Sequence, residues 1–184
     1  ARSAGAAAPW PADPAVRPRS AWAAPPPAGA LAAEPDVRFL LVHHTATAGG
    51  YAEGDVPGLL REVFRAHTAA EKGWPDVAYN FFVDRFGGVW EGRAGSLAGP
   101  VRADATGGDQ GHAQLCCFLG DHRTGPPTPR AREAMVGLLA ALADRHGIDT
   151  AAGTTASFVS RGSNRWPAGE TVTVRTIAGH RDVS

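Results

Sequence analysis

The run FLLVHHTAT at residues 39–47 places four apolar residues directly before two adjacent histidines. Short apolar runs of this kind are typical of strands that are buried on both faces. Such a strand needs neighbouring strands beside it and covering layers above and below it, so it constrains the fold more than any other stretch. The two imidazoles at the end of this strand also need an explanation, because buried polar rings need a hydrogen-bond partner or a functional role.

The rest of the chain carries the signals that would complete such a fold. Apolar side chains at helical spacing predict helices, and short apolar or alternating runs predict strands. In chain order, the expected elements are a strand at 37–42, a helix at 55–72, a β-hairpin at 77–92 that turns at 84–88, a strand at 113–120, a helix at 128–146 and a strand at 170–180.

Both expected helices show an apolar stripe that needs a sheet to cover. Thr128 is expected to cap the second helix, with Pro129 at its first position, where the missing N–H costs nothing. The stripe of this helix is Ala134, Val136, Leu138, Leu139 and Leu142. The stripe of the first helix is Val56, Leu59, Leu60, Val63, Phe64 and Ala66.

These elements predict a single α/β domain with a mixed central β-sheet flanked by helices. We assign this domain to residues 37–184. Residues 1–36 are rich in Ala and Pro, a composition that favours extended backbone and builds no core by itself. We therefore expect an extended N-terminal arm packed on the domain. A chain of 184 residues is long enough to bury a core without disulfide bonds.

Composition narrows the choice of partners. Lys+Arg and Asp+Glu both count 18, so the chain is formally neutral, and we expect no nucleic acid binding because no basic field is available. No apolar stretch reaches the roughly 18 residues that cross a bilayer, so we expect no membrane insertion. Cys116 and Cys117 stand in an apolar run and are expected to pack as small hydrophobic residues. The chain begins at Ala1 without a Met or a signal pattern, which is typical of a processed or trimmed start.

The histidines at the strand ends admit two interpretations. A lone His at such a position is more often a hydrogen-bonded structural residue than a metal ligand. His180 favours the metal-ligand interpretation, because it also follows an apolar strand and would reach the same rim of the sheet as His43. Side chains alternate along a strand, so if His43 faces a metal ion, His44 faces elsewhere unless the strand bends.

Five stretches resemble the peptidoglycan recognition protein and N-acetylmuramoyl-L-alanine amidase family, in the order and spacing of that family. They are RPRSAWAA, LLVHHTA, GWPDVAYNFFVDRFGGVWEGRAG, TPRAREAMVGLLAALADRHGI and RTIAGHRDV. The resemblance covers roughly residues 16–184 and is nearest to secreted actinobacterial members. It implies a sheet flanked by helices and a Zn2+-dependent amidase. The implied reaction is hydrolysis of the amide bond between N-acetylmuramic acid and L-alanine in peptidoglycan.

The resemblance also implies roles for single residues. The first His of VHHT and the His of GHRD fall on His43 and His180 and are implied to be zinc ligands. Tyr79 falls on the tyrosine that the amidases place beside the zinc, where its hydroxyl can stabilise an oxyanion; the alternative is a half-buried strand residue. His44 and Thr45 fall on positions that border the peptide groove.

Further residues have both a functional and a structural interpretation. His67 falls on a groove-lining position of the family, but on sequence alone it is equally well a solvated helix residue. Arg93 could meet a stem-peptide carboxylate through its planar guanidinium, whereas a surface salt bridge is the plainer expectation. Three other histidines are expected to have no role beyond structure, namely His112, His122 and His146.

The chain departs from the family pattern on one side of the implied groove. Ala105 stands where the family has His, Gln110 where it has Asn, Ala113 where it has Ser, and Leu115 where it has Gly. The third zinc ligand of the family, a Cys followed by Pro-Gly, lies a few residues beyond GHRDV and therefore beyond Ser184. We expect the given sequence to be truncated at its C-terminal end and, with two ligands, to hold zinc weakly and to be inactive by itself.

Two functions from different classes remain open. In the first, the protein is a secreted, monomeric zinc amidase that acts on muropeptides in the cell wall. In the second, it is a non-catalytic module that binds the stem peptide of peptidoglycan, and the residues after Ser184 discriminate the two. In both cases we expect muropeptides to bind in preference to bare glycan strands. A groove rimmed by His44, Thr45, His67 and Tyr79 suits a peptide with a few polar anchors.

Overall fold

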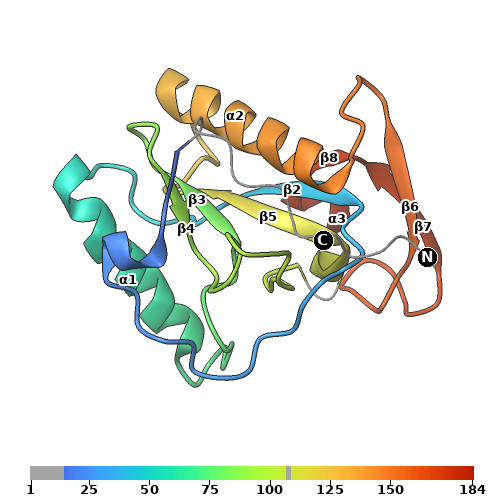
Figure 1. Cartoon of the computed structure of the whole chain (residues 1–184), viewed down its shortest axis with the longest axis horizontal. Coiled ribbons are helices and arrows are strands. Elements are labelled where there is room, and N and C mark those ends of the chain that lie inside the picture. Colours follow the sequence, from blue (N-terminus) through green and yellow to red (C-terminus); the bar gives the residue numbers. More distant parts are fainter. Residues whose placement is uncertain (1–14, 107–108) are drawn as a thin grey trace.

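The computed structural model describes residues 15–106 and 109–184, which form an α/β fold around a six-stranded sheet (Figure 1). Of the neighbouring strand pairs, β3 and β4 are antiparallel and the others are parallel. The predicted mixed central sheet is therefore confirmed. The strand order across the sheet is β1 (Val16–Arg17), β4 (Val89–Glu91), β3 (Phe81–Val83), β5 (Ala113–Phe118), β2 (Phe39–His44) and β8 (Ile177–Gly179).

β2 and β5 lie in the interior of the sheet, and their composition explains why. Residues 39–41 of β2 and 115–117 of β5 are fully buried. Strands that are covered on both faces must be apolar throughout rather than alternating, which these two runs provide. β2 extends beyond the predicted end at residue 42, because His43 and His44 continue to pair with Cys117 and Phe118 of β5.

Two helices cover opposite faces of the sheet. They are α1 (Val56–Thr68) and α2 (Pro129–His146), and Figure 1 shows α2 above the strands and α1 at the lower left. Leu60 of α1 packs into one core cluster with Leu41 of β2. Leu138 of α2 packs into a second cluster with Leu40. Because Leu40 and Leu41 are consecutive, strand alternation sends them into different layers.

α2 begins as predicted, and Leu138, Leu139 and Leu142 of the predicted stripe are buried. Thr128 Oγ1 accepts a hydrogen bond from the Ala131 N–H at 3.1 Å, and Gly147 ends the helix in the left-handed conformation. The predicted inclusion of Val136 is wrong, because this residue is 67% exposed. It lies at the solvent-facing edge of the stripe, three residues before Leu139 and seven before Ala143. The buried residues of the helix are Ala131, Met135, Leu138, Leu139, Leu142 and Ala143. Ala66 of α1 is likewise exposed.

The stretch predicted as one strand at 170–180 is divided between two sheets. β7 (Thr171–Arg175) pairs antiparallel with β6 (Thr155–Val159) in a separate two-stranded sheet, whereas β8 joins the main sheet beside β2. At the division, the Thr176 hydroxyl donates to Asp149 O at 2.7 Å and its N–H donates to Thr154 O at 3.1 Å. The prediction of one strand is wrong because alternation alone does not determine which neighbour each half pairs with.

Short elements complete the described chain. They are the 3-10 turns η1 (Arg19–Trp22), η2 (Glu53–Asp55) and η3 (Asp109–His112), and the helix α3 (His180–Val183). η1 lies between β1 and β2, η2 leads into α1, and η3 leads into β5. None of the helices within residues 15–106 and 109–184 combines the length and apolarity that a bilayer crossing requires.

The segment before β2 contributes to the fold from residue 15 onward, while residues 1–14 of the predicted arm lie outside the described residues. Trp22 is fully buried, and its indole N–H donates to Glu91 O at 2.8 Å. Arg19 donates to the buried carboxylate of Asp76 at 3.1 Å. These contacts fasten the segment to β4 and to the loop before β3. The domain boundary after residue 36 stays a prediction.

We expect Trp22→Ala to lower the free energy of unfolding by about 3–5 kcal/mol, the usual cost of removing a large aromatic side chain from a core. Val136→Ala is the control, because it removes apolar atoms from an exposed position and should change stability by less than about 0.5 kcal/mol. Urea denaturation followed by circular dichroism measures both. Equally small losses would show that the N-terminal segment is not part of the core.

Candidate functional site

His43 and His180 lie against each other at one rim of the sheet. His43 stands near the end of β2, and His180 follows β8 directly as the first residue of α3. β2 and β8 are parallel neighbours with Val42 opposite Gly179, so the next residue of each reaches the same rim. The ring centroids are 4.1 Å apart. The juxtaposition expected from the two strand ends is present, and the role of the pair as metal ligands stays a prediction.

The two ring nitrogens of His43 have different surroundings. Nδ1 lies 2.6 Å from the carbonyl oxygen of His44 and 2.8 Å from its backbone nitrogen. Nε2 is buried and has no hydrogen-bond partner among the described residues. When Nδ1 donates its proton to the His44 carbonyl, Nε2 presents a bare lone pair, which is the form that binds a metal ion.

Both imidazoles of the pair favour the neutral form. Burial, with a smaller contribution from His180, lowers the pKa of His43 to about 4. Burial also lowers the pKa of His180 itself. Because a metal ion binds neutral imidazole, the pair is available as ligands at neutral pH without first losing protons.

The pair fits part of a zinc site. A catalytic zinc ion usually has three protein ligands and one open position. Within residues 15–106 and 109–184, no group of three His, Cys, Asp or Glu side chains could hold a metal ion. The described residues therefore offer two neutral imidazoles, one of which has an unpaired buried nitrogen, and these would be two of the three ligands that such a site needs.

Tyr79 approaches the His43 ring from the loop that precedes β3. Its ring centroid lies 5.0 Å from that of His43 and 5.5 Å from that of Phe82, which it meets edge-on. Tyr79 is 5% exposed. Burial, and then the neighbouring Cys117, raises the pKa of Tyr79 well above its ordinary value. The hydroxyl therefore keeps its proton at neutral pH and is available as a hydrogen-bond donor.

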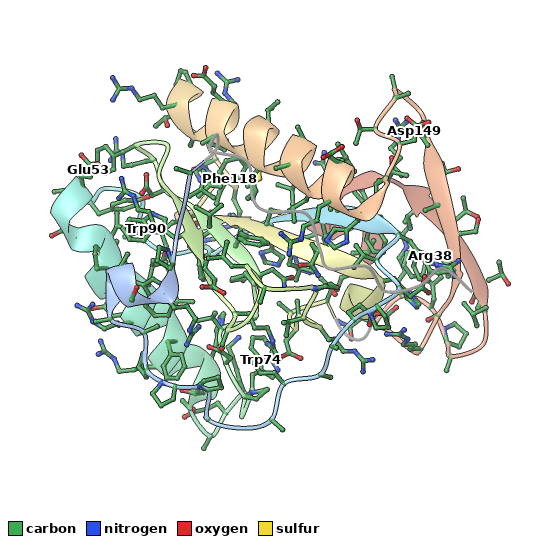
Figure 2. The ribbon with its side chains drawn as sticks, in the orientation of Figure 1. Arg38, Glu53, Trp74, Trp90, Phe118 and Asp149 are labelled. Carbon is green, nitrogen blue, oxygen red and sulfur yellow. The ribbon has the colours of Figure 1, made fainter. Side chains whose placement is uncertain are left out.

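His67, near the end of α1, is buried beside Tyr79. It is 8% exposed, so the alternative of a solvated helix residue is wrong. Nδ1 accepts a hydrogen bond from the Ala78 N–H at 3.0 Å, which leaves the proton on Nε2 as a donor. Trp74, labelled near the lower end of α1 in Figure 2, packs edge-on against the ring with 5.0 Å between centroids. Burial, with Lys72 as a further cause, lowers the pKa of His67 to about 4.

His44 and Thr45 direct polar atoms toward the loop that follows β5. His44 Nδ1 accepts a hydrogen bond from the His122 N–H at 3.0 Å, and Thr45 Oγ1 accepts one from the Gly120 N–H at 2.9 Å. His44 pairs in register with Phe118, which is labelled beneath α2 in Figure 2. Strand alternation therefore places His44 on the α2 face and its neighbour on the α1 face. The contact of His44 and Thr45 with substrate stays a prediction.

Arg93 is buried rather than solvated. It is 3% exposed, and Nη1 donates to Asp104 Oδ2 at 2.7 Å and to Val77 O at 3.0 Å. An ion pair was the plainer expectation, but its predicted position on the surface is wrong. Nε is buried without a partner among the described residues. A buried guanidinium needs its counter-charge. Asp104 supplies it, and sequence reasoning missed this partner. The role of Arg93 in binding substrate stays a prediction.

The positions that depart from the family pattern serve packing in part. Ala113 and Leu115 are fully buried in β5, and the Leu115 N–H donates to Asn80 Oδ1 at 2.8 Å. Ala105 has a φ of 82°, a conformation that is costly for a residue with a Cβ atom. The side chain of Gln110 lies outside the described residues. Leu115 thus fills the core beneath the site rather than opening space beside it.

Two cavities in the described residues lie away from these side chains. One of about 910 Å³ lies between residues 15–18, the turn at 86–89 and α2, and another of about 540 Å³ lies between residues 48–51 and the start of α1. Neither is lined by a predicted site residue. We place the candidate site at the histidine pair, because a reactive centre needs groups that bind metal or transfer protons.

The sequence of this chain is similar to one known protein family and to individual proteins of animals. A family profile described as N-acetylmuramoyl-L-alanine amidase matches residues 33–184. Peptidoglycan recognition protein 1 of Rattus norvegicus is 32% identical over 125 residues. These residues are 67% of this chain and 66% of that protein, so the match spans just under two thirds of the length of that relative. Peptidoglycan-recognition protein LE of Drosophila melanogaster is 34% identical over 106 residues, which are 57% of this chain and 30% of that protein.

Solved structures share the fold. Drosophila peptidoglycan recognition protein SD has a TM-score of 0.71 at 19% identity, with 92% of this chain and 85% of that chain covered. Peptidoglycan recognition protein LE, solved in complex with tracheal cytotoxin, a monomeric diaminopimelic acid-type peptidoglycan, has a TM-score of 0.70 at 25% identity, with 92% and 84% covered. The likeness confirms the predicted α/β fold.

We expect the folded state to lose stability as the pH falls from about 6.5 toward 4, in part through His67. The pKa of His67 is about 4 in the folded protein and about 6.5 when unfolded. Its contribution is fully present above pH 6.5 and is lost below it, because the unfolded state then binds more protons.

The variant His67→Asn isolates this contribution, because the amide oxygen of Asn occupies the position of Nδ1. Its side-chain oxygen can still accept the Ala78 N–H, but it does not titrate, so the slope of unfolding free energy against pH should flatten by up to about 1.4 kcal/mol per pH unit. Urea denaturation at a series of pH values measures both proteins. Parallel profiles would contradict a buried neutral imidazole at this position.

Proposed function

Because the chain belongs to the N-acetylmuramoyl-L-alanine amidase family, we propose that it is a zinc-dependent amidase that cleaves the bond between N-acetylmuramic acid and L-alanine in peptidoglycan. The observation that carries the proposal is the contact between the His43 and His180 rings, with the buried Nε2 of His43 left without a partner among the described residues. We propose further that the protein acts as a secreted monomer on the cell wall.

His43 and His180 would hold the zinc ion. A site of this kind needs a third protein ligand, which in the family that the chain resembles is a Cys that follows the GHRD motif. When bound, zinc would lower the pKa of a water molecule and polarise a carbonyl group. The contribution of the described residues is to keep both imidazoles neutral and, through the His44 carbonyl, to hold the proton on His43 Nδ1.

Tyr79 would assist from the side of the His43 ring. Its hydroxyl remains protonated because burial raises its pKa, so it can donate a hydrogen bond to the scissile carbonyl oxygen. As negative charge develops on this oxygen, the bond strengthens. A preorganised donor in a site shielded from water contributes about 3 kcal/mol to such a transition state.

Four residues are proposed to bind the stem peptide. His67 offers Nε2–H as a donor, because its Nδ1 already accepts a backbone N–H. His44 and Thr45 are anchored to the loop after β5, so they would present their remaining polar atoms from fixed positions. Arg93 would meet a carboxylate of the peptide, which would join or displace its present partner Asp104.

A non-catalytic peptidoglycan-binding module is the second candidate function. Within the described residues, the His43–His180 pair gains no third ligand, and the curated relatives are named as recognition proteins. Such a module would bind the same muropeptides through the same side chains. The two functions differ only in whether the amide bond is cut, so they need experiments that separate binding from hydrolysis.

In the full-length protein, we expect Tyr79→Phe to lower kcat by about 10²- to 10³-fold with KM nearly unchanged, because it deletes a donor that acts on the developing oxyanion. Tyr51→Phe is the matched control. It deletes the hydroxyl of the other of the two tyrosines, which donates to Leu119 O at 3.0 Å, and it should leave kcat unchanged. Release of stem peptide from purified peptidoglycan measures turnover, and full activity of Tyr79→Phe would remove this residue from the mechanism.

His43→Ala separates the two candidate functions. In an amidase, this change should abolish both zinc retention and hydrolysis, because the remaining ligands cannot hold the ion. In a binding module, neither the wild type nor the variant should contain zinc, and both should bind muropeptides. Zinc content by mass spectrometry, hydrolysis of peptidoglycan and calorimetry with muropeptides give the three readouts.

A glycan strand without stem peptide serves as the control ligand. It should bind more weakly than the muropeptide in either case, because the proposed contacts are made to the peptide. If the His43→Ala variant hydrolyses peptidoglycan at the wild-type rate, the zinc-amidase proposal is wrong.

A further inference from the structure

Cys116 and Cys117 are adjacent in β5 but belong to different layers. Both are free cysteines and both are fully buried. Cys116 packs in the cluster beneath α2, whereas Cys117 packs in the cluster beneath α1. Side chains alternate along the strand, so only Cys117 lies on the face that carries His43. The mechanism proposed above uses neither thiol.

Cys117 stands in one row with His43 across the sheet. The parallel register pairs Cys117 with His43 of β2 on one side and with Phe82 of β3 on the other. Residues that pair across neighbouring strands project their side chains from the same face. The thiol therefore lies in the floor of the candidate site, between a proposed zinc ligand and the ring on which Tyr79 packs.

The side chain of Tyr79 lies beside this thiol. Its ring centroid is 5.5 Å from that of Phe82 and 5.0 Å from that of His43, the two residues that pair with Cys117, and Tyr79 and Cys117 pack in the same core cluster. Cys117 also contributes to raising the pKa of Tyr79. The Cys117 Sγ also lies 3.5 Å from Phe118 O, to which it donates its own proton. With that proton directed to the backbone, the sulfur has lone pairs available for the Tyr79 O–H.

We propose that Cys117 is a positioning residue for Tyr79: its thiol accepts the tyrosine O–H and fixes the direction of the hydroxyl beside the His43–His180 pair. Its consequence for catalysis rests on the proposed amidase function. The contact between the two side chains does not, because it is a property of the folded chain alone. Cys117 itself touches no substrate.

A thiol suits this task because sulfur is a weak hydrogen-bond acceptor. It orients the hydroxyl when no charge is present. A hydrogen bond to an ionised acceptor is roughly twice as strong as one between neutral groups, so the O–H can turn from the sulfur to the carbonyl oxygen as charge develops. Burial raises the pKa of both Cys117 and Tyr79, and both groups therefore keep their protons at neutral pH.

The test compares Cys117→Ala and Cys117→Ser with Cys116→Ala in the full-length protein. Cys116→Ala is the matched control, because it removes an equally buried thiol from the adjacent residue on the opposite face. The direct readout is the carbon-13 resonance of the Tyr79 Cζ atom in tyrosine-labelled protein, which responds to the hydrogen bonding of the phenol oxygen. Tyr79→Phe assigns this resonance, and kcat, KM and zinc content are measured alongside.

We expect Cys117→Ala to move the Tyr79 resonance and to lower kcat about 2- to 10-fold, the range set by one neutral hydrogen bond, with KM and zinc content unchanged. Cys117→Ser should restore most of both properties, and Cys116→Ala should change neither.

Three results would overturn the proposal. They are an unmoved resonance in Cys117→Ala, an equal shift in Cys116→Ala, and loss of zinc from Cys117→Ala, which would make the thiol a ligand. If the wild-type protein does not hydrolyse peptidoglycan, the amidase function fails, whereas the resonance still decides whether the thiol positions the hydroxyl.

Discussion

The parallel pairing of β2 with β5 and β8 is the constraint on which the candidate site depends. It sets His180 on one side of His43 and Cys117 on the other, although the three residues are far apart in the sequence. The pairing requires strands that tolerate burial on both faces, which the apolar runs provide, and helices that cover both faces, which α1 and α2 provide. The geometry of the site therefore follows from the core, and side chains mounted on such elements are held more firmly than side chains on loops.

The types and layers of the main elements could be predicted from the sequence, because the signals for them are local. The spacing of apolar residues reports a helix wherever it occurs, and Thr128 followed by Pro129 marks the start of α2 without knowledge of the rest. Features that depend on pairing could not be predicted. The division at Thr176 is set by the neighbours available to each half, and Val136 is exposed because it lies at the edge of the α2 face that packs on the sheet.

The candidate site shows the same limit. That the two strands end at one rim could be inferred from their pattern, which is why the contact between His43 and His180 was predictable. The burial of His67 and Arg93 could not be, because it is produced by residues elsewhere in the chain, among them Trp74 and Asp104. Sequence patterns also do not show which residues pair across neighbouring strands. The place of the Cys117 thiol beside His43 could therefore not be predicted, and its apolar neighbours in the sequence indicated only that it is buried.

The backbone segments that carry the two histidines of the pair differ in local stability. His43 belongs to an interior strand whose ladder hydrogen bonds open only when the sheet comes apart. His180 begins α3, one residue beyond Gly179, the last residue of β8 that pairs with β2. Backbone amide exchange with solvent would therefore be slower at His43 than at His180. The residence time of an ion held between the two rings would then be limited by local opening at His180 rather than by unfolding of the domain.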